Sequence, residues 1–154
     1  MSPRDEDPTA AWYARLAATS DAVVHTHASV VFLRGERAYK LKKCVDFGFL
    51  DYSTPERRRH FCEEEVRLNS RWCDGIYLGV CPVPEGGFDA DGPPVDWAVV
   101  MQRYDEADTL RVWVEDGRAT PALLEAVGRA LAARQARAPR PEAARRWASF
   151  EAVR

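Results

Sequence analysis

Several patterns that mark membrane, metal-binding or nucleic-acid-binding proteins are absent from this sequence. No apolar run approaches the ~18 residues of a membrane-spanning helix, and the acidic segment 4–8 does not resemble a secretory signal peptide. A net charge of -2 provides no basic footprint for nucleic acid or for an anionic membrane. We therefore expect a cytoplasmic protein that binds neither nucleic acid nor membranes.

Cysteine and histidine are sparse as well. The four cysteines include no Cys-x-x-Cys pair, and the three histidines do not complete a zinc-binding pattern. We expect reduced thiols that behave as small hydrophobic side chains, and the sequence indicates no metal-binding residue.

Lysine is scarce, and its distribution is uneven. Only three of the 22 basic residues are lysines, and Lys40, Lys42 and Lys43 fall within four positions. A compact ammonium on a flexible stem suits phosphate oxygens, whereas the guanidinium of arginine is a planar fork. The cluster therefore favours a phosphate-binding segment over an incidental group on a solvated strand.

Hydrophobic periodicity and turn residues predict strands first and helices afterwards. A short amphipathic helix is expected over residues 9–18. The expected strands cover residues 22–25, 29–33, 38–42, 76–83 and 95–101. The expected later helices cover residues 110–114, 120–138 and 142–153. This order predicts an α+β fold rather than a parallel sheet built from βαβ units.

The longest predicted helix lies between the third and fourth strands. Ser53 is expected to cap it, Pro55 suits its first turn, and Glu56 would complete a capping box with Ser53. We expect this helix to continue to about Trp72. Its expected buried positions are Phe61, Val66, Leu68 and Trp72.

The chain also carries a family resemblance. The runs THASVVFLRGERAYKLKK, VDFGFLDYSTPERRRHFCEEEVRLN, YLGVCPVPEGG and WAVVMQRY resemble the amino-terminal part of aminoglycoside-phosphotransferase-like proteins, a branch often fused to a small ATP-binding kinase domain. The resemblance extends over roughly residues 9–138, with a weaker match in the tail RRWASFEAVR.

That resemblance implies a protein-kinase-like fold. Residues 1–104 would form the nucleotide-binding lobe, a five-stranded antiparallel sheet with one glutamate-bearing helix. Residues 105–154 would form the helical start of a truncated carboxy-terminal lobe.

Kinase-like enzymes place a lysine over the nucleotide phosphates and hold it with a helix carboxylate. Ala38-Tyr39-Lys40 matches the Ala-x-Lys pattern of the third strand, although Lys42 shares that face and stays an alternative. Lys43 should point to the other face.

The resemblance also indicates which glutamate fills the helix position. The family's helix has a carboxylate followed by apolar residues three and seven positions on, and Glu65 has Leu68 and Trp72 there. Glu64 is the second choice, with Leu68 four positions on, and the remaining glutamates would lie on a solvated face.

Two further segments would contact the nucleotide. The loop Thr26-His27-Ala28-Ser29 replaces the glycine-rich phosphate cover, and the hydroxyls of Thr26 and Ser29 would supplement its backbone N–H donors. The segment 101–104, with Gln102 and Tyr104, falls at the hinge between the lobes, where its backbone would pair with the adenine edge.

Asp46-Phe47-Gly48 spells the magnesium-binding triplet of protein kinases but precedes the glutamate helix, on the wrong side of the cleft. We interpret it as a turn with a packed phenylalanine.

The residues that perform phosphoryl transfer are missing. In the family these come from a His-x-Asp motif, an asparagine five positions after its aspartate, and a later aspartate. No histidine here is followed by such an aspartate, and Asn69 is the only asparagine. We therefore assign no catalytic residue, expect a weak or partial ATP site, and expect magnesium only together with the missing lobe.

Three explanations compete. The chain is a fragment of a longer two-lobed enzyme, a self-contained ATP-binding or regulatory module, or an unrelated α+β interaction domain. We favour the first. In either of the first two cases, a complementary carboxy-terminal lobe or another protein would be a partner besides the nucleotide.

Overall fold

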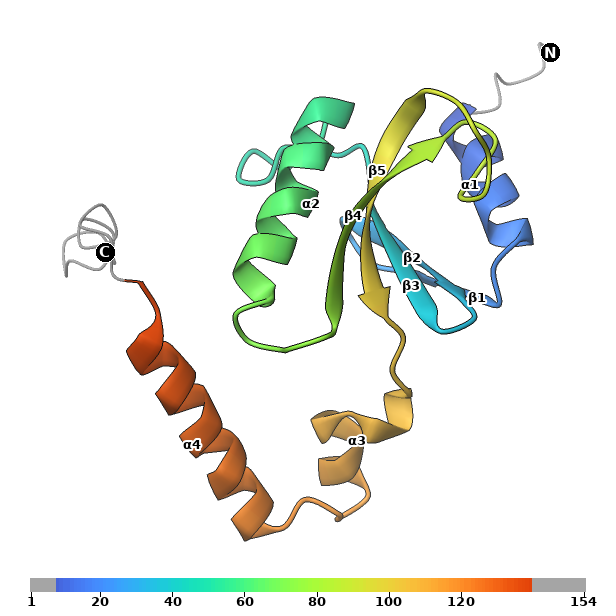
Figure 1. Cartoon of the computed structure of the whole chain (residues 1–154). Helices are drawn as coiled ribbons and strands as arrows, with labels where there is room; N and C mark the ends of the chain where they lie inside the picture. Colours follow the sequence, from blue (N-terminus) through green and yellow to red (C-terminus); the bar gives the residue numbers. More distant parts are fainter. Residues whose placement is uncertain (1–7, 140–154) are drawn as a thin grey trace. The chain divides into compact units, whose positions relative to one another are not determined.

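The computed structural model describes residues 8–139 and divides the chain into two compact units, Met1–Asp105 and Glu106–Arg154. In the first unit, an antiparallel sheet carries one helix on each face (Figure 1). Its five strands are β1 (Ala22–His25), β2 (Ser29–Arg34), β3 (Arg37–Lys42), β4 (Tyr77–Pro84) and β5 (Pro94–Gln102). Its helices are α1 (Pro8–Ala18) and α2 (Pro55–Asn69).

The sheet has the strand order β1-β2-β3-β5-β4, and every neighbouring pair is antiparallel. All five strands lie within one or two residues of the predicted ranges, so the predicted α+β class with a five-stranded antiparallel sheet is confirmed. β3 lies at the centre of the sheet, where Lys40 pairs with Val31 on β2 and with Val99 on β5. Because β3 is paired on both sides, its register is fixed, and so are the positions of Lys40 and Lys42 along the sheet.

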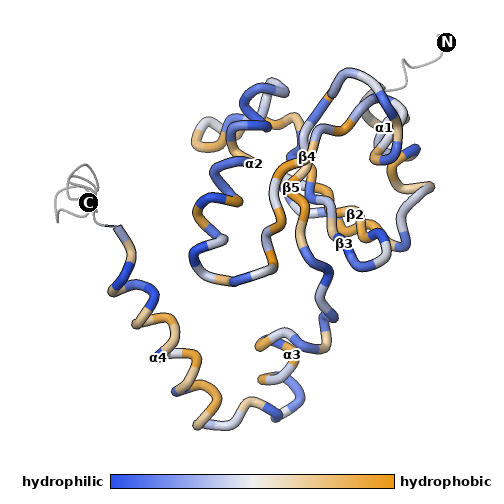
Figure 2. Tube along the Cα trace, viewed as in Figure 1, coloured by the Kyte–Doolittle hydropathy of each residue, from blue (hydrophilic) through white to orange (hydrophobic). Residues whose placement is uncertain are grey.

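The sheet face that meets α1 is an apolar core. It is formed by side chains from both helical and strand positions: Trp12, Leu16, Val30, Phe32, Leu41, Val83 and Ala98. The alternation of a strand puts Tyr39 and Leu41 on this face and Ala38, Lys40 and Lys42 on the other, as predicted. Figure 2 shows hydrophobic stretches in β2, β4 and β5, whereas α2 is mostly hydrophilic.

The start of α2 differs from the prediction. Thr54, not Ser53, is the cap residue, and its hydroxyl accepts from the Arg57 backbone N–H at 3.3 Å. Ser53 instead donates its hydroxyl to Asp51 at 2.6 Å. The predicted capping box between Ser53 and Glu56 is therefore wrong. The helix starts one residue later than predicted, so the third residue after the cap is Arg57 rather than Glu56.

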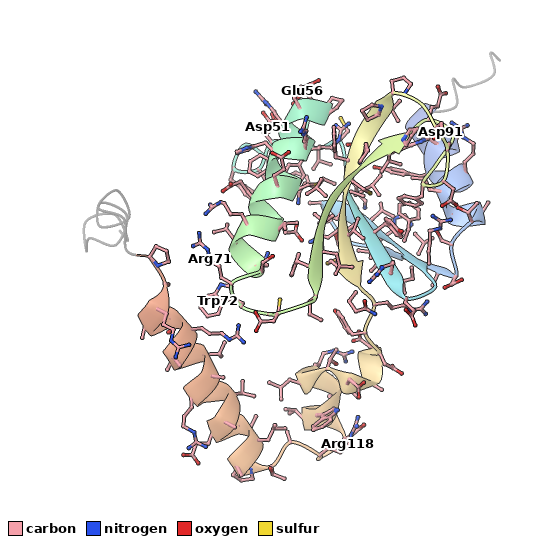
Figure 3. All side chains as sticks on the ribbon, viewed as in Figure 1. Asp51, Glu56, Arg71, Trp72, Asp91 and Arg118 are labelled. Atoms are coloured by element: carbon pink, nitrogen blue, oxygen red, sulfur yellow. The ribbon has the colours of Figure 1, made fainter. Side chains whose placement is uncertain are left out.

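The end and the buried face of α2 also differ. The helix ends at Asn69, and Leu68 and Trp72 are 45% and 39% exposed. Figure 3 shows Trp72 on the connection that leads from α2 to β4. The buried helix residues are Arg58 and Cys62, and Glu65 follows at the next helical step. Phe61 and Val66 are only half-buried. The face that α2 turns to the sheet therefore carries the charged Arg58 and Glu65 beside Cys62, where a wholly apolar stripe was predicted.

The described part of the second unit, residues 106–139, contains the 3-10 turn η1 (Glu106–Asp108), followed by α3 (Leu110–Glu115) and α4 (Pro121–Arg137). Both predicted helices are confirmed, and Thr109 and Thr120 cap them. Over residues 106–139 no side chain is buried. The helix predicted over residues 142–153 and the weakly matching tail lie outside the described residues.

No helix in the described part of the chain has the length and apolar character needed to cross a bilayer.

Candidate functional site

Two lysines of β3 converge on one carboxylate of α2. The Lys40 ammonium lies 2.9 Å from Glu65 Oε1, and the Lys42 ammonium lies 2.8 Å from Glu65 Oε2. Lysines two positions apart on a strand share a face, and the turn of α2 that carries Glu65 packs over that face. The predicted pairing of Lys40 with Glu65 is confirmed.

The two lysines differ sharply in exposure. The Lys42 side chain is 4% exposed, that of Glu65 is 13% exposed, and that of Lys40 is 29% exposed. The Lys42 ammonium also lies 5.0 Å from the centroid of the buried Tyr52 ring, a cation–π distance. Lys42 is thus enclosed, whereas Lys40 lies between the carboxylate and solvent.

Lys42 and Glu65 stabilise each other in the charged form. Burial opposes the charge on Lys42, but the hydrogen bond and the charge of Glu65 outweigh it and raise the pKa of Lys42. Burial likewise opposes the charge on Glu65, but hydrogen bonds from Lys42 and Lys40 outweigh it and lower the pKa of Glu65. Two ammonium groups against one carboxylate leave one positive charge in excess, and no second carboxylate of the described residues is within ion-pair distance.

The structure separates Glu64 from the lysines. Glu64 forms an ion pair with Arg67 on the surface of α2, and Glu63 pairs there with Arg59. Both pairs connect residues three or four apart on the exposed helix face. Of the three consecutive glutamates only Glu65 reaches the sheet.

The loop predicted to cover phosphates forms the tight turn between β1 and β2. The Thr26 hydroxyl accepts from the Ser29 N–H at 3.0 Å and donates to the Ser29 carbonyl oxygen at 3.1 Å. Ser29 is buried. The Thr26 hydroxyl therefore holds the turn closed, and neither predicted hydroxyl lies free for a ligand in this conformation.

Lys43 contacts the same turn. Its ammonium donates to the Thr26 carbonyl oxygen at 2.5 Å, and its backbone N–H donates to Ala28 at 2.8 Å. No pattern in the sequence predicts this contact, because it depends on how the turn folds over the end of β3.

The predicted hinge continues β5. The Gln102 N–H donates to the Ile76 carbonyl oxygen at 2.8 Å, and its side-chain oxygen accepts from Arg37 at 2.6 Å. The Arg103 N–H donates to the Glu36 carbonyl oxygen at 2.9 Å. These two donors are engaged within the protein, while Tyr104 is 61% exposed.

Asp46-Phe47-Gly48 forms a turn, as predicted. Asp46 accepts from the Gly48 N–H at 2.8 Å, and Gly48 has a φ of 79°, which favours glycine. The predicted packing of Phe47 is wrong, because its side chain is 45% exposed and stacks only on the more exposed Phe49.

A second ion pair on the α2 side was not predicted. Arg58 donates through Nε to both carboxylate oxygens of Asp96, at 3.0 and 2.9 Å, and through Nη1 to the Tyr52 carbonyl oxygen at 3.0 Å. Burial raises the pKa of Asp96 although Arg58 opposes that rise. Arg58, Cys62 and Glu65 are spaced four and then three residues apart. This spacing in the sequence would have indicated that they share one face of the helix.

No group of three metal-ligating side chains occurs among residues 8–139. A pocket of about 320 Å³ is lined by residues of α1 together with Arg58 and Asp96, and none of the lysines lines it. It is lined by Trp12, Tyr13, Arg15, Cys44, Ser53, Pro55, Arg58, Glu85, Val95 and Asp96.

The chain is similar to mycobacterial proteins whose names call them uncharacterized. It is 37% identical over 118 residues to the uncharacterized protein Rv2004c of Mycobacterium tuberculosis and to the uncharacterized protein Mb2027c of Mycobacterium bovis. The match covers 77% of this chain but only 23% of each relative, so the chain spans about a quarter of the length of these proteins.

No protein-family model matches the chain, and no solved structure matches it significantly.

Proposed function

We propose that the first unit binds the phosphates of a nucleotide, as the amino-terminal lobe of an aminoglycoside-phosphotransferase-like kinase. The observation that carries this proposal is the partly exposed Lys40 ammonium, held by Glu65 within a cluster that has one excess positive charge. A partly buried excess charge favours an anion, and a lysine held by a helix carboxylate is the arrangement that kinase-like enzymes use for ATP phosphates.

Exposure favours Lys40 over Lys42 as the lysine that binds phosphate. A ligand approaching from solvent reaches Lys40, at 29% exposure, without moving the protein. To reach Lys42, at 4% exposure, it would have to displace Glu65.

In the longer protein to which such a lobe would belong, the reaction would be ATP-dependent phosphoryl transfer to a small-molecule hydroxyl. The sequence contains no His-x-Asp motif to position that hydroxyl, and residues 8–139 offer no three-ligand metal site. We therefore propose weak nucleotide binding without turnover for this chain by itself.

The test is a titration of a fluorescent ATP analogue into the 154-residue chain at low salt. Lys40→Met removes a charge-assisted contact of about 1.5–3 kcal/mol, so we expect roughly 10- to 150-fold weaker binding. The matched control is Arg129→Met, which removes one positive charge from an exposed pair with Glu125 on α4. Equal affinities of wild type and Lys40→Met, or no binding by wild type, would contradict the proposal.

A second candidate function, a partner-binding module, is favoured by the second unit. Its helices leave apolar side chains 43–54% exposed, namely Leu110, Val114, Leu124 and Leu131. Apolar faces of this kind gain stability when another surface covers them. We propose that a complementary lobe or another protein packs there. A chain that binds no nucleotide, but is stabilised by a partner, would favour this second function over the first.

A further inference from the structure

The turn between β1 and β2 lacks one of its usual backbone hydrogen bonds. In a regular two-residue hairpin the residues on either side of the loop, here Thr26 and Ser29, exchange two such bonds. The Thr26 N–H does donate to the Ser29 carbonyl oxygen, at 2.9 Å, but the Ser29 N–H donates to the Thr26 hydroxyl at 3.0 Å. The Thr26 carbonyl oxygen is left without its backbone donor, and the Lys43 ammonium takes that place at 2.5 Å.

The backbone of the loop explains why side chains support this turn. The turns that suit two-residue hairpins need a positive φ in the loop. No non-glycine residue in the described part of the chain has a positive φ, so His27 and Ala28 do not form such a turn. Other turns do not match the twist of the two strands by themselves. The shape of this turn therefore depends on the Thr26 hydroxyl and on Lys43.

The peptide unit between Thr26 and His27 connects Lys43 to the candidate site. The C=O and N–H of a trans peptide point in opposite directions, and residues 8–139 contain no cis peptide. The Lys43 N–H donates to the Ala28 carbonyl oxygen and so extends the alternation of β3 by one residue, which puts the Lys43 side chain opposite Lys40. Because the Thr26 carbonyl is drawn to Lys43, the His27 N–H is directed to the Lys40 side of the sheet.

We propose that Lys43 is a positioning residue, whose ammonium holds the Thr26–His27 peptide so that the His27 N–H donates to a phosphate bound at Lys40. Neither the His27 N–H nor the Ala28 N–H donates to another described residue, and successive free N–H groups form a cradle for anions. Lys40 stays paired with Glu65, because the turn supplies further donors and neither group has to move. This inference rests on the proposed nucleotide site and adds the residue that presents its turn.

The first experiment follows the turn by NMR in the 154-residue chain labelled with nitrogen-15. Inorganic tripolyphosphate should shift the amide signals of His27 and Ala28 together with the ammonium signal of Lys40. In ligand-free Lys43→Met, the residual dipolar coupling of the His27 N–H, which reports its direction, should change. The coupling of the Val31 N–H, within β2, is the control and should stay the same.

Each outcome bears on a different part of the proposal. A shift at Lys40 without a shift at the His27 amide would overturn the inference and leave the proposed nucleotide site standing. If tripolyphosphate shifts none of these signals, the proposed nucleotide site fails. An unchanged His27 coupling in Lys43→Met would overturn the inference whatever the ligand does, because Lys43 then does not orient the peptide.

The second experiment separates position from charge, because loss of the Lys43 charge alone would also weaken anion binding. Thr26→Val removes no charge, but it returns the Ser29 N–H to the carbonyl of residue 26 and so disturbs the same peptide. Lys43→Met and Thr26→Val should each weaken tripolyphosphate binding roughly three- to tenfold. The double variant should bind about as well as the weaker-binding single variant, because both changes break one arrangement. Losses that multiply, or unchanged binding in either single variant, would overturn the inference.

Discussion

The two faces of the sheet are built differently. The face under α1 is apolar, with Leu16, Phe32 and Leu41 fully buried. The face under α2 combines buried apolar side chains, namely Ala38, Cys62 and Val99, with buried charges. There Arg58 pairs with Asp96 and two lysines pair with Glu65. Burying apolar area stabilises a fold without constraining chemistry, whereas buried charges cost desolvation energy and contribute little net stability. In this contrast the α1 face is purely apolar, and the α2 face carries the buried charges of the candidate site.

The largest expected effect comes from breaking a buried ion pair on the α2 face. Arg58→Met leaves Asp96 buried without its partner and should cost about 3–5 kcal/mol of stability in a denaturant titration. The double variant Arg58→Met, Asp96→Asn should recover most of that loss. The matched control is Arg59→Met, one position along, which removes an exposed pair with Glu63 and a cation–π contact with the Trp97 ring and should cost about 1–2 kcal/mol. Equal losses at positions 58 and 59 would remove the distinction between the buried and exposed faces of α2.

A cavity on the α1 face should produce the next largest effect. Leu16 is fully buried in the core, so Leu16→Ala should cost about 2–5 kcal/mol while the nucleotide affinity of the folded protein stays unchanged. Leu68→Ala is the matched control, because Leu68 is 45% exposed, and its cost should lie well below that of Leu16→Ala. A loss of nucleotide binding in folded Leu16→Ala would show that the two faces are not independent.

The two faces of the sheet also differ in how much of their structure could be predicted from the sequence. The strands were predictable because each is a short run containing apolar residues and is bounded by polar or turn-forming residues, such as Thr26-His27-Ala28 and the glycine-rich segment 84–94. The buried face of α2 was not predictable in the same way. The prediction placed the buried face along the apolar residues of the helix, but two of these, Leu68 and Trp72, are exposed. Arg58 and Cys62 occupy the buried positions because their partners, Asp96 and the Trp97 carbonyl oxygen, lie on a strand about 35 residues away.

The candidate site was predictable in part for a similar reason. The pairing of Lys40 with Glu65 followed from strand alternation and from the family pattern. The engagement of Lys42 with the second oxygen of Glu65, and of Lys43 with Thr26, depends on tertiary packing that a linear pattern does not contain.

A smaller loss of stability should show which residue caps the start of α2. Thr54→Ala removes the hydroxyl that caps the helix and should cost about 1 kcal/mol. Ser53→Ala removes the hydroxyl of an exposed residue, bonded to half-buried Asp51, and should cost less than about 0.5 kcal/mol. Thermal denaturation followed by circular dichroism distinguishes the two variants. A larger loss at Ser53 would restore the cap that the sequence predicted.

The smallest effect concerns pH. The lysines hold the pKa of Glu65 below its ordinary value of 4.5, so Glu65 stays ionised in the folded protein at pH values where the unfolded chain binds a proton. Its contribution to stability is therefore present above pH 4.5 and is lost as the pH falls through the lower folded pKa. Wild type should lose stability more steeply than Lys42→Met, Glu65→Gln below pH 4.5. Parallel stability curves would indicate that the lysines do not stabilise the carboxylate.

Covalent labelling with an acyl phosphate of ATP examines the proposed site itself. When this reagent binds, a lysine near the phosphates attacks the acyl carbon, an amide forms, and the bond between the acyl group and the phosphate breaks. Mass spectrometry then identifies which of the three lysines carries the acyl group. If the α2 face binds nucleotide phosphates, Lys40 is labelled first, and excess ATP suppresses the labelling. Labelling that falls mainly on Lys43, or labelling of Lys40 that excess ATP does not reduce, would contradict the account.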